Sequence, residues 1–112
     1  MKTADVIIIG SGAAGLFNAL FLPQDYKVIV ITKKTVEESD SFLAQGGISA
    51  LKNPEDYDSY FEDTMKAGHY ENDKGAVEKM IKESPQIIQD LKDFGVRFDL
   101  KDGEIEFTRE GG

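Results

Sequence analysis

The chain has 112 residues, a formal net charge of −8, no cysteine and one histidine, His69. The lack of cysteine excludes a disulfide scaffold, a thiolate metal site and a thiol nucleophile, and one histidine argues against a zinc site or a serine-protease triad. The acidic balance leaves no basic stripe for nucleic acid or an anionic membrane, and without a signal peptide or an uninterrupted apolar span the cytoplasm is the default location.

The first third of the chain predicts a strand–helix–strand unit. Val6–Ile9 is a short β-branched run, typical of a strand buried on both faces. Residues 13–22 follow with apolar side chains at helical spacing, and Pro23 ends that helix. Residues 27–32 form a second apolar run, so the unit is a βαβ with a right-handed crossover.

The middle of the chain predicts a loop over residues 33–43 and a short helix within residues 44–50. An amphipathic helix then carries Tyr57, Tyr60 and Phe61 on one face, which we expect to be core, and ends at Gly68.

The last third predicts two helices and a hairpin. One helix starts near Asp73, and a second starts at Ser84-Pro85, read as an N-cap followed by proline at the first helical position, and is stopped by Gly95. Asp102-Gly103 lies between alternating apolar residues, which predicts a two-residue β-hairpin.

The sequence Gly10-Ser-Gly12-Ala-Ala-Gly15 fits the pattern G-x-G-x-x-G between the first strand and the first helix. We expect Gly10 to allow the tight turn, Gly12 to let a pyrophosphate approach, and Gly15 to let helix and strand pack closely. The phosphates would accept hydrogen bonds from free N–H groups at the helix N-terminus, which needs no net positive charge. The alternative is a glycine turn used only for close packing.

The acidic residue that often binds a ribose at the end of the second strand is missing. Thr32 could contact a ribose through its hydroxyl, and Lys33 could face a phosphate or an adenine edge. Lys33 and Lys34 could instead begin a solvated loop. This departure argues against NAD and leaves FAD open.

The block at residues 39–48, which contains A-Q-G-G, is far more specific than the glycine turn. With that turn, it resembles the fumarate reductase/succinate dehydrogenase flavoprotein superfamily. The stretches at residues 61–68 and 108–112 are similar to the L-aspartate oxidase family in particular. The resemblance covers residues 4–112, effectively the whole chain.

The resemblance implies an α/β fold: a Rossmann-like FAD-binding βαβ unit followed by helices and a β-hairpin, as an incomplete part of a larger flavoprotein. Residues 1–112 would be the N-terminal part of an FAD-binding domain. The rest of that domain, a capping domain, a C-terminal domain and the arginine that acts as proton acceptor would lie outside this chain.

The resemblance also implies which residues bind FAD. Lys33 would lie near the adenosine, Ser41 would donate to phosphate, and Gln45 with the neighbouring amides would polarise the flavin. Asp40 stands where succinate dehydrogenases carry a histidine that binds FAD covalently, so non-covalent FAD is expected. The full expected set is Gly10, Ser11, Gly12, Ala13, Ala14, Gly15, Thr32, Lys33, Asp40, Ser41, Phe42, Leu43, Ala44, Gln45, Gly46 and Gly47.

Glu110 matches the family glutamate that orients the substrate, and a carboxylate suits the α-ammonium group of L-aspartate. The activity implied is oxidation of L-aspartate to iminoaspartate with oxygen or fumarate as acceptor, the first step of NAD biosynthesis from aspartate, with a channel to quinolinate synthase as a further partner. This chain alone is expected to be inactive. The alternatives are a fumarate reductase or succinate dehydrogenase flavoprotein, a non-catalytic FAD- or nucleotide-binding module, and a truncated product without native function.

Overall fold

The computed structural model describes residues 3–44 and 46–108. The chain divides into two compact units, Met1–Gly47 and Ile48–Gly112, and each is described by itself. The mixture of helices with a short parallel sheet agrees with the expected α/β class.

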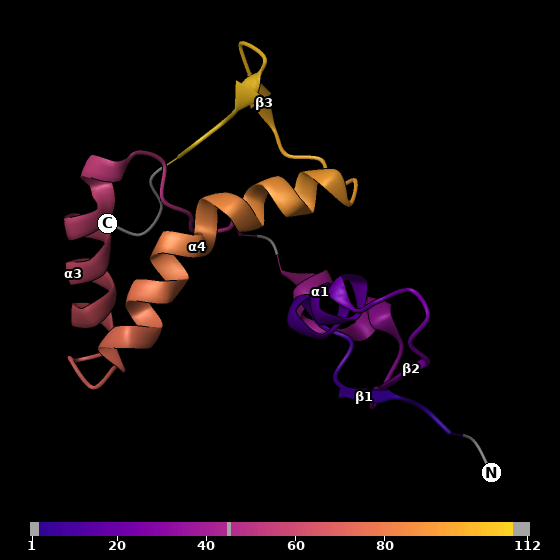
Figure 1. The fold of residues 1–112 in the computed structure, drawn as a ribbon. Coiled ribbons are helices and arrows are strands. Elements are labelled where there is room, and N and C mark those ends of the chain that lie inside the picture. Colours follow the sequence, from indigo (N-terminus) through magenta and orange to yellow (C-terminus); the bar gives the residue numbers. More distant parts are fainter. Residues whose placement is uncertain (1–2, 45, 109–112) are drawn as a thin grey trace. The chain divides into compact units, whose positions relative to one another are not determined.

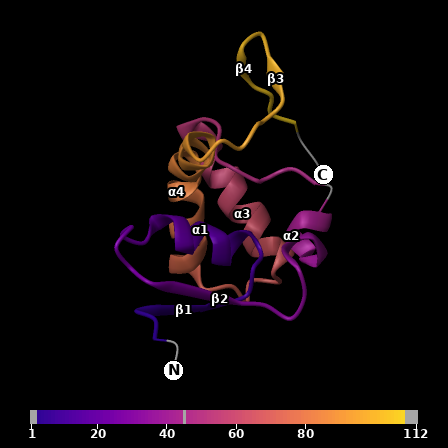
Figure 2. The same cartoon turned by 90° about the vertical axis from the view of Figure 1, so that its right-hand side faces the viewer.

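The first unit is the predicted strand–helix–strand unit (Figures 1 and 2). Strand β1 (Val6–Ile9) is followed by helix α1 (Ala13–Phe21) and strand β2 (Val28–Ile31). The strands pair in parallel, with Val6 opposite Val28 and Ile9 opposite Ile31. Parallel neighbours need a crossover connection, and α1 provides it.

Burial of β1 on both faces was a wrong expectation. Exposure alternates along the strand, and Ile7 and Ile9 keep 60% and 85% of their surface accessible. The sheet of the first unit has two strands, and α1 packs on one face, where Gly15 approaches Ile8. Successive side chains point to opposite faces of a strand, so Ile7 and Ile9 lie on the face that α1 does not cover.

The predicted loop over residues 33–43 contains two short helical segments, the 3₁₀ helix η1 (Val36–Glu38) and helix α2 (Asp40–Leu43). Thr35 and Glu38 form a capping box at η1, and the Ser39 hydroxyl accepts from the Phe42 amide at 3.3 Å. Such caps stabilise a single helical turn without an apolar period. The short helix expected within residues 44–50 was wrong, because the described residues there are not helical.

The second unit has a small helical core. The 3₁₀ helix η2 (Pro54–Asp56) leads into α3 (Tyr57–Ala67), and α4 (Lys74–Asp93) packs beside it. Met65 of α3 and Val77 and Ile81 of α4 are buried. The partly buried residues packed against them are Leu51, Tyr57, Tyr60 and Phe61. The expected core face of α3 and its end at Gly68 are confirmed.

One helix occupies the segment where two were expected. Helix α4 begins after Asp73, whose side chain accepts from the Ala76 amide at 2.8 Å, and runs through Pro85 (Figure 1 shows its bend). Proline cannot donate to the carbonyl four residues earlier, here that of Ile81. The Ser84 hydroxyl donates to that carbonyl at 2.7 Å instead. The prediction that Ser84 is an N-cap was wrong. Ser84 lies inside α4, where its hydroxyl provides the hydrogen bond that Pro85 cannot donate.

The predicted hairpin is confirmed. Strands β3 (Leu100–Lys101) and β4 (Glu104–Ile105) pair antiparallel, with Leu100 opposite Ile105. Asp102 and Gly103 between them have φ of 53° and 86°. Two central residues with positive φ form the turn whose twist matches that of paired strands.

No helix in residues 3–44 or 46–108 is long and apolar enough to cross a membrane.

We expect Gly15→Ala to disrupt the first unit, because a Cβ there would lie 2.1 Å from the Gly10 carbonyl oxygen, a backbone atom that cannot easily move. Overpacking of this kind costs about 1–3 kcal/mol. Hydrogen exchange of the β1 and β2 amides should become faster. Gly75→Ala is the matched control, since it lies in the second unit, its Cβ would lie no closer than 3.3 Å to the Asp73 carboxylate, and alanine favours a helix. Equal exchange in both variants would contradict the prediction.

We expect Ser84→Ala to destabilise the second unit by about 1–3 kcal/mol, because it leaves buried backbone groups unpaired. The Ser84 hydroxyl accepts from the Leu51 amide at 2.8 Å while it donates to Ile81. Urea unfolding followed by circular dichroism would measure the change. Ser59→Ala removes an exposed hydroxyl of α3 and should shift stability by less than about 0.5 kcal/mol. A similar loss in the two variants would show that the Ser84 bonds contribute little.

Candidate cofactor-binding site

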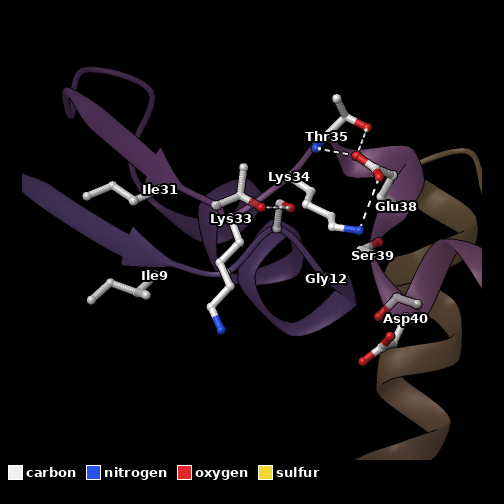
Figure 3. A pocket seen from close by; sticks show the side chains of 13 residues that line it. Ile9, Gly12, Ile31, Lys33, Lys34, Thr35, Glu38, Ser39 and Asp40 are labelled. Carbon is white, nitrogen blue, oxygen red and sulfur yellow. Dashed lines mark hydrogen bonds and ion pairs between the residues drawn. The ribbon is translucent and has the colours of Figure 1, made fainter.

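A pocket of about 560 Å³ opens at the carboxyl ends of β1 and β2, inside the first unit (Figure 3). Crevices outside the carboxyl ends of parallel strands are where open α/β sheets bind ligands. Three segments form the walls: the end of β1 with the glycine turn, the end of β2, and the residues around η1 and α2. The lining residues are Ile9, Gly10, Ser11, Gly12, Ile31, Thr32, Lys33, Lys34, Thr35, Glu38, Ser39, Asp40 and Ser41.

The glycine turn has the geometry that the sequence motif predicts. Gly10 has φ of +110°, which L side chains rarely adopt, and its amide donates to the Ile31 carbonyl at 2.8 Å. Gly15 leaves no room for a Cβ against the Gly10 carbonyl. A Cβ on Gly12 would come within 3.0 Å of the Ser41 hydroxyl oxygen. The glycine turn itself therefore lines the pocket, and α1 begins directly after it.

Backbone donors gather at the start of α1. The Ala13 amide donates to the Ser41 hydroxyl oxygen at 2.9 Å. The amides of Ser11, Gly12 and Ala14 have no acceptor within the described ranges. No acidic residue occupies the first turn of α1, so the positive end of the helix dipole is not neutralised there. These donors suit an anion such as a pyrophosphate.

Two hydroxyls join the turn to the second strand. The buried Ser11 side chain donates to the Thr32 hydroxyl oxygen at 2.9 Å. This bond holds Thr32, the first residue after β2, directly beside the glycine turn. A hydroxyl thus occupies the place where an acidic residue often binds a ribose.

The charged side chains of the pocket differ in their partners. The Lys34 ammonium lies 3.3 Å from one carboxylate oxygen of Glu38, and the other oxygen accepts from the Thr35 amide. Figure 3 shows the Lys33 side chain extending in another direction from the end of β2. Among the residues that the structure describes, Lys33 and Asp40 form no ion pair.

The structure brings part of the expected FAD-binding set together at this pocket. The expected residues that line it are Gly10, Ser11, Gly12, Thr32, Lys33, Asp40 and Ser41. Ala13 reaches Ser41 through its amide. The described members that do not line it are Ala14, Gly15, Phe42, Leu43, Ala44, Gly46 and Gly47. Gln45 and Glu110 lie outside the described residues, as does Arg109.

Sequence reasoning missed several lining residues, namely Ile9, Ile31, Lys34, Thr35, Glu38 and Ser39. A signal was available for two of them, because Thr35-x-x-Glu38 is the spacing of a capping box. That box shapes the wall of the pocket that faces the glycine turn.

A dinucleotide fits the observed donor set. Unpartnered amides at a helix N-terminus suit a pyrophosphate, and the absence of a side chain at Gly12 leaves room for the pyrophosphate to approach. The hydroxyls of Thr32 and Ser41 suit a ribose and a phosphate. Within residues 3–44 and 46–108, no three His, Cys, Asp or Glu side chains cluster as metal ligands would.

Comparison with known proteins agrees with this donor set. The family model described as "FAD binding domain" matches residues 5–112. The L-aspartate oxidase of Clostridium perfringens is 44% identical over 110 residues, which are 98% of this chain and 25% of that protein. The L-aspartate oxidase of Clostridium acetobutylicum is 46% identical over 108 residues, 96% of this chain and 25% of that protein. The chloroplastic L-aspartate oxidase of Oryza sativa is 40% identical over 113 residues, 99% of this chain and 18% of that protein.

The chain thus spans about a quarter or less of the length of these curated relatives, and no solved structure matches it. The family model covers almost all of the chain, including the glycine turn and both strands that form the pocket. The chain belongs to the FAD binding domain family, which points to FAD as its cofactor.

Proposed function

We propose that this chain supplies the pyrophosphate- and adenosine-binding part of an L-aspartate oxidase that holds FAD non-covalently. The observation that carries the proposal is the set of unpartnered amides of Ser11, Gly12 and Ala14 around the start of α1, of which Ser11 and Gly12 line the pocket. The names of the relatives supply the substrate, L-aspartate.

Different residues of the pocket would bind different parts of the cofactor. Amides of the glycine turn would donate to pyrophosphate oxygens, and the Ser41 hydroxyl, 2.9 Å from the Ala13 amide, could turn to donate to the same oxygens. Thr32 would bind a ribose hydroxyl while its partner Ser11 fixes its position. The closeness of Ser41 to Gly12 means that a side chain at Gly12 would crowd this cradle.

When bound, FAD accepts the electrons and the hydrogen removed from the substrate. In the whole protein, Glu110 would orient the α-ammonium group of L-aspartate, and an arginine outside this chain would accept the proton. The product would be iminoaspartate, formed on the route to NAD and passed to quinolinate synthase. Oxygen or fumarate would reoxidise the cofactor.

We expect the chain to bind FAD and Gly12→Ala to weaken that binding about tenfold, because the added methyl group meets Ser41 beside the phosphate donors. Quenching of flavin fluorescence during a titration measures the affinity. Gly75→Ala, in α4, is the matched control and should bind like the original chain. Riboflavin, which has no pyrophosphate, should bind far more weakly than FAD. Equal affinity for FAD and riboflavin would refute the assignment of the cradle.

We expect the whole protein that carries this segment to oxidise L-aspartate in preference to succinate, and residues 1–112 alone, loaded with FAD, to oxidise neither. Imine or peroxide formation, measured with each substrate, tests both statements. Faster oxidation of succinate would favour the fumarate reductase or succinate dehydrogenase alternative. Turnover by the short chain would contradict its expected inactivity.

A further inference from the structure

The wall of the pocket that faces the glycine turn contains two single helical turns, η1 and α2, which meet at Ser39 (Figure 3). We propose that Ser39 is a positioning residue for the pyrophosphate of the cofactor, because it caps α2 and thereby keeps the Ser41 hydroxyl beside the first amide of α1. The inference rests on the proposed FAD site and adds to it a residue that the family resemblance does not assign.

Ser41 joins this wall to the glycine turn. Its hydroxyl oxygen accepts from the Ala13 amide at 2.9 Å, across 28 residues of the chain. A Cβ on Gly12 would come within 3.0 Å of the same oxygen, so the hydroxyl lies against the turn that would receive the pyrophosphate. A displacement of Ser41 by about 1 Å would break this hydrogen bond and withdraw the hydroxyl from the phosphate cradle.

Burial does not hold α2 in place. Helix α2 has four residues, and its two large apolar side chains, Phe42 and Leu43, keep 62% and 63% of their surface exposed. A helix of one turn is marginal without packing, because its formation fixes many dihedral angles for few hydrogen bonds. The conformation of α2 in this chain therefore depends on the hydrogen bonds at its N-terminal end.

Ser39 makes hydrogen bonds to both helical turns. Its amide donates to the Val36 carbonyl at 3.0 Å, where η1 ends. Its hydroxyl accepts from the Phe42 amide at 3.3 Å, and its backbone is extended, with φ of −75° and ψ of 148°, as is typical of an N-cap residue. Ser41 is the second residue of α2, so its position depends on the turn that this cap stabilises.

A double-mutant cycle between Ser39 and Ser41 tests the proposal, with the affinity of the chain for FAD measured by quenching of flavin fluorescence. Ser39→Ala should weaken binding about fivefold, because α2 loses its cap and only chains with the turn formed bind well. Ser41→Ala should weaken binding about tenfold, because a hydrogen bond to a charged phosphate is lost. In the Ser41→Ala background, Ser39→Ala should change the affinity less than about twofold, because no hydroxyl is left to position.

Two further variants serve as controls for this cycle. Ser39→Asn keeps a side-chain oxygen that can cap α2 and should restore the affinity to within about twofold of the original chain. Ser59→Ala removes an exposed hydroxyl of α3 and should bind FAD like the original chain.

Hydrogen exchange of the Ala13 amide in the ligand-free chain, measured by NMR, distinguishes positioning from a direct contact between Ser39 and FAD. Ser39→Ala and Ser41→Ala should both make this amide exchange faster, whereas Ser39→Asn should keep the original rate. The β1 and β2 amides should exchange as before, which shows that the first unit stays folded.

Losses of affinity that add in the double variant would overturn the inference. An Ala13 amide whose exchange is unchanged by Ser39→Ala would also overturn it. If the original chain binds FAD, either result leaves the proposed FAD site standing. Failure of the original chain to bind FAD would overturn the proposed function together with the inference.

Discussion

The close approach of α1 to β1 is the constraint on which the candidate site depends. No side chain fits at Gly15, because the Gly10 carbonyl occupies the space that a Cβ would need. This contact makes the helix start directly after the strand, through a glycine with φ of +110°. The unpaired amides of Ser11 and Gly12, just before the first helical turn, therefore lie at the carboxyl ends of the strands, in the pocket.

This arrangement explains how a chain with a net charge of −8 can hold a polyanion. Amide dipoles at a helix N-terminus act over a few ångströms. The net charge of the chain has little effect on the potential at that distance, because salt screens the more distant carboxylates. Of the lining side chains, Lys34 and Glu38 neutralise each other. The local field is then set by the helix N-terminus, Lys33 and Asp40, and not by the composition of the chain.

Features decided by neighbouring residues were predictable from the sequence. The βαβ unit follows from two β-branched runs around a glycine turn, and the hairpin follows from Asp102-Gly103, because two consecutive residues with positive φ suit that turn. The exposure of Ile9 was not predictable, because a strand's composition does not show how many layers cover it. Thr35, Glu38 and Ser39 in the pocket wall were missed because η1 and α2 depend on side-chain caps and lack an apolar period. The substrate-orienting role proposed for Glu110 rests on resemblance alone.

Ser84 and Pro85 show why a local rule can mislead. A serine followed by a proline is typical of a helix start. In this structure the Ser84 hydroxyl instead donates to the Ile81 carbonyl, for which Pro85 has no N–H, and accepts a hydrogen bond from the Leu51 amide. The effects of substituting the two residues are therefore coupled. A residue with a backbone N–H in place of Pro85 would donate to the Ile81 carbonyl, and Ser84 would then be needed only for its hydrogen bond with Leu51. Loss of Ser84 with Pro85 kept would leave the Ile81 carbonyl without a donor. In lineages of this family, the tolerance of either position should depend on what the other carries.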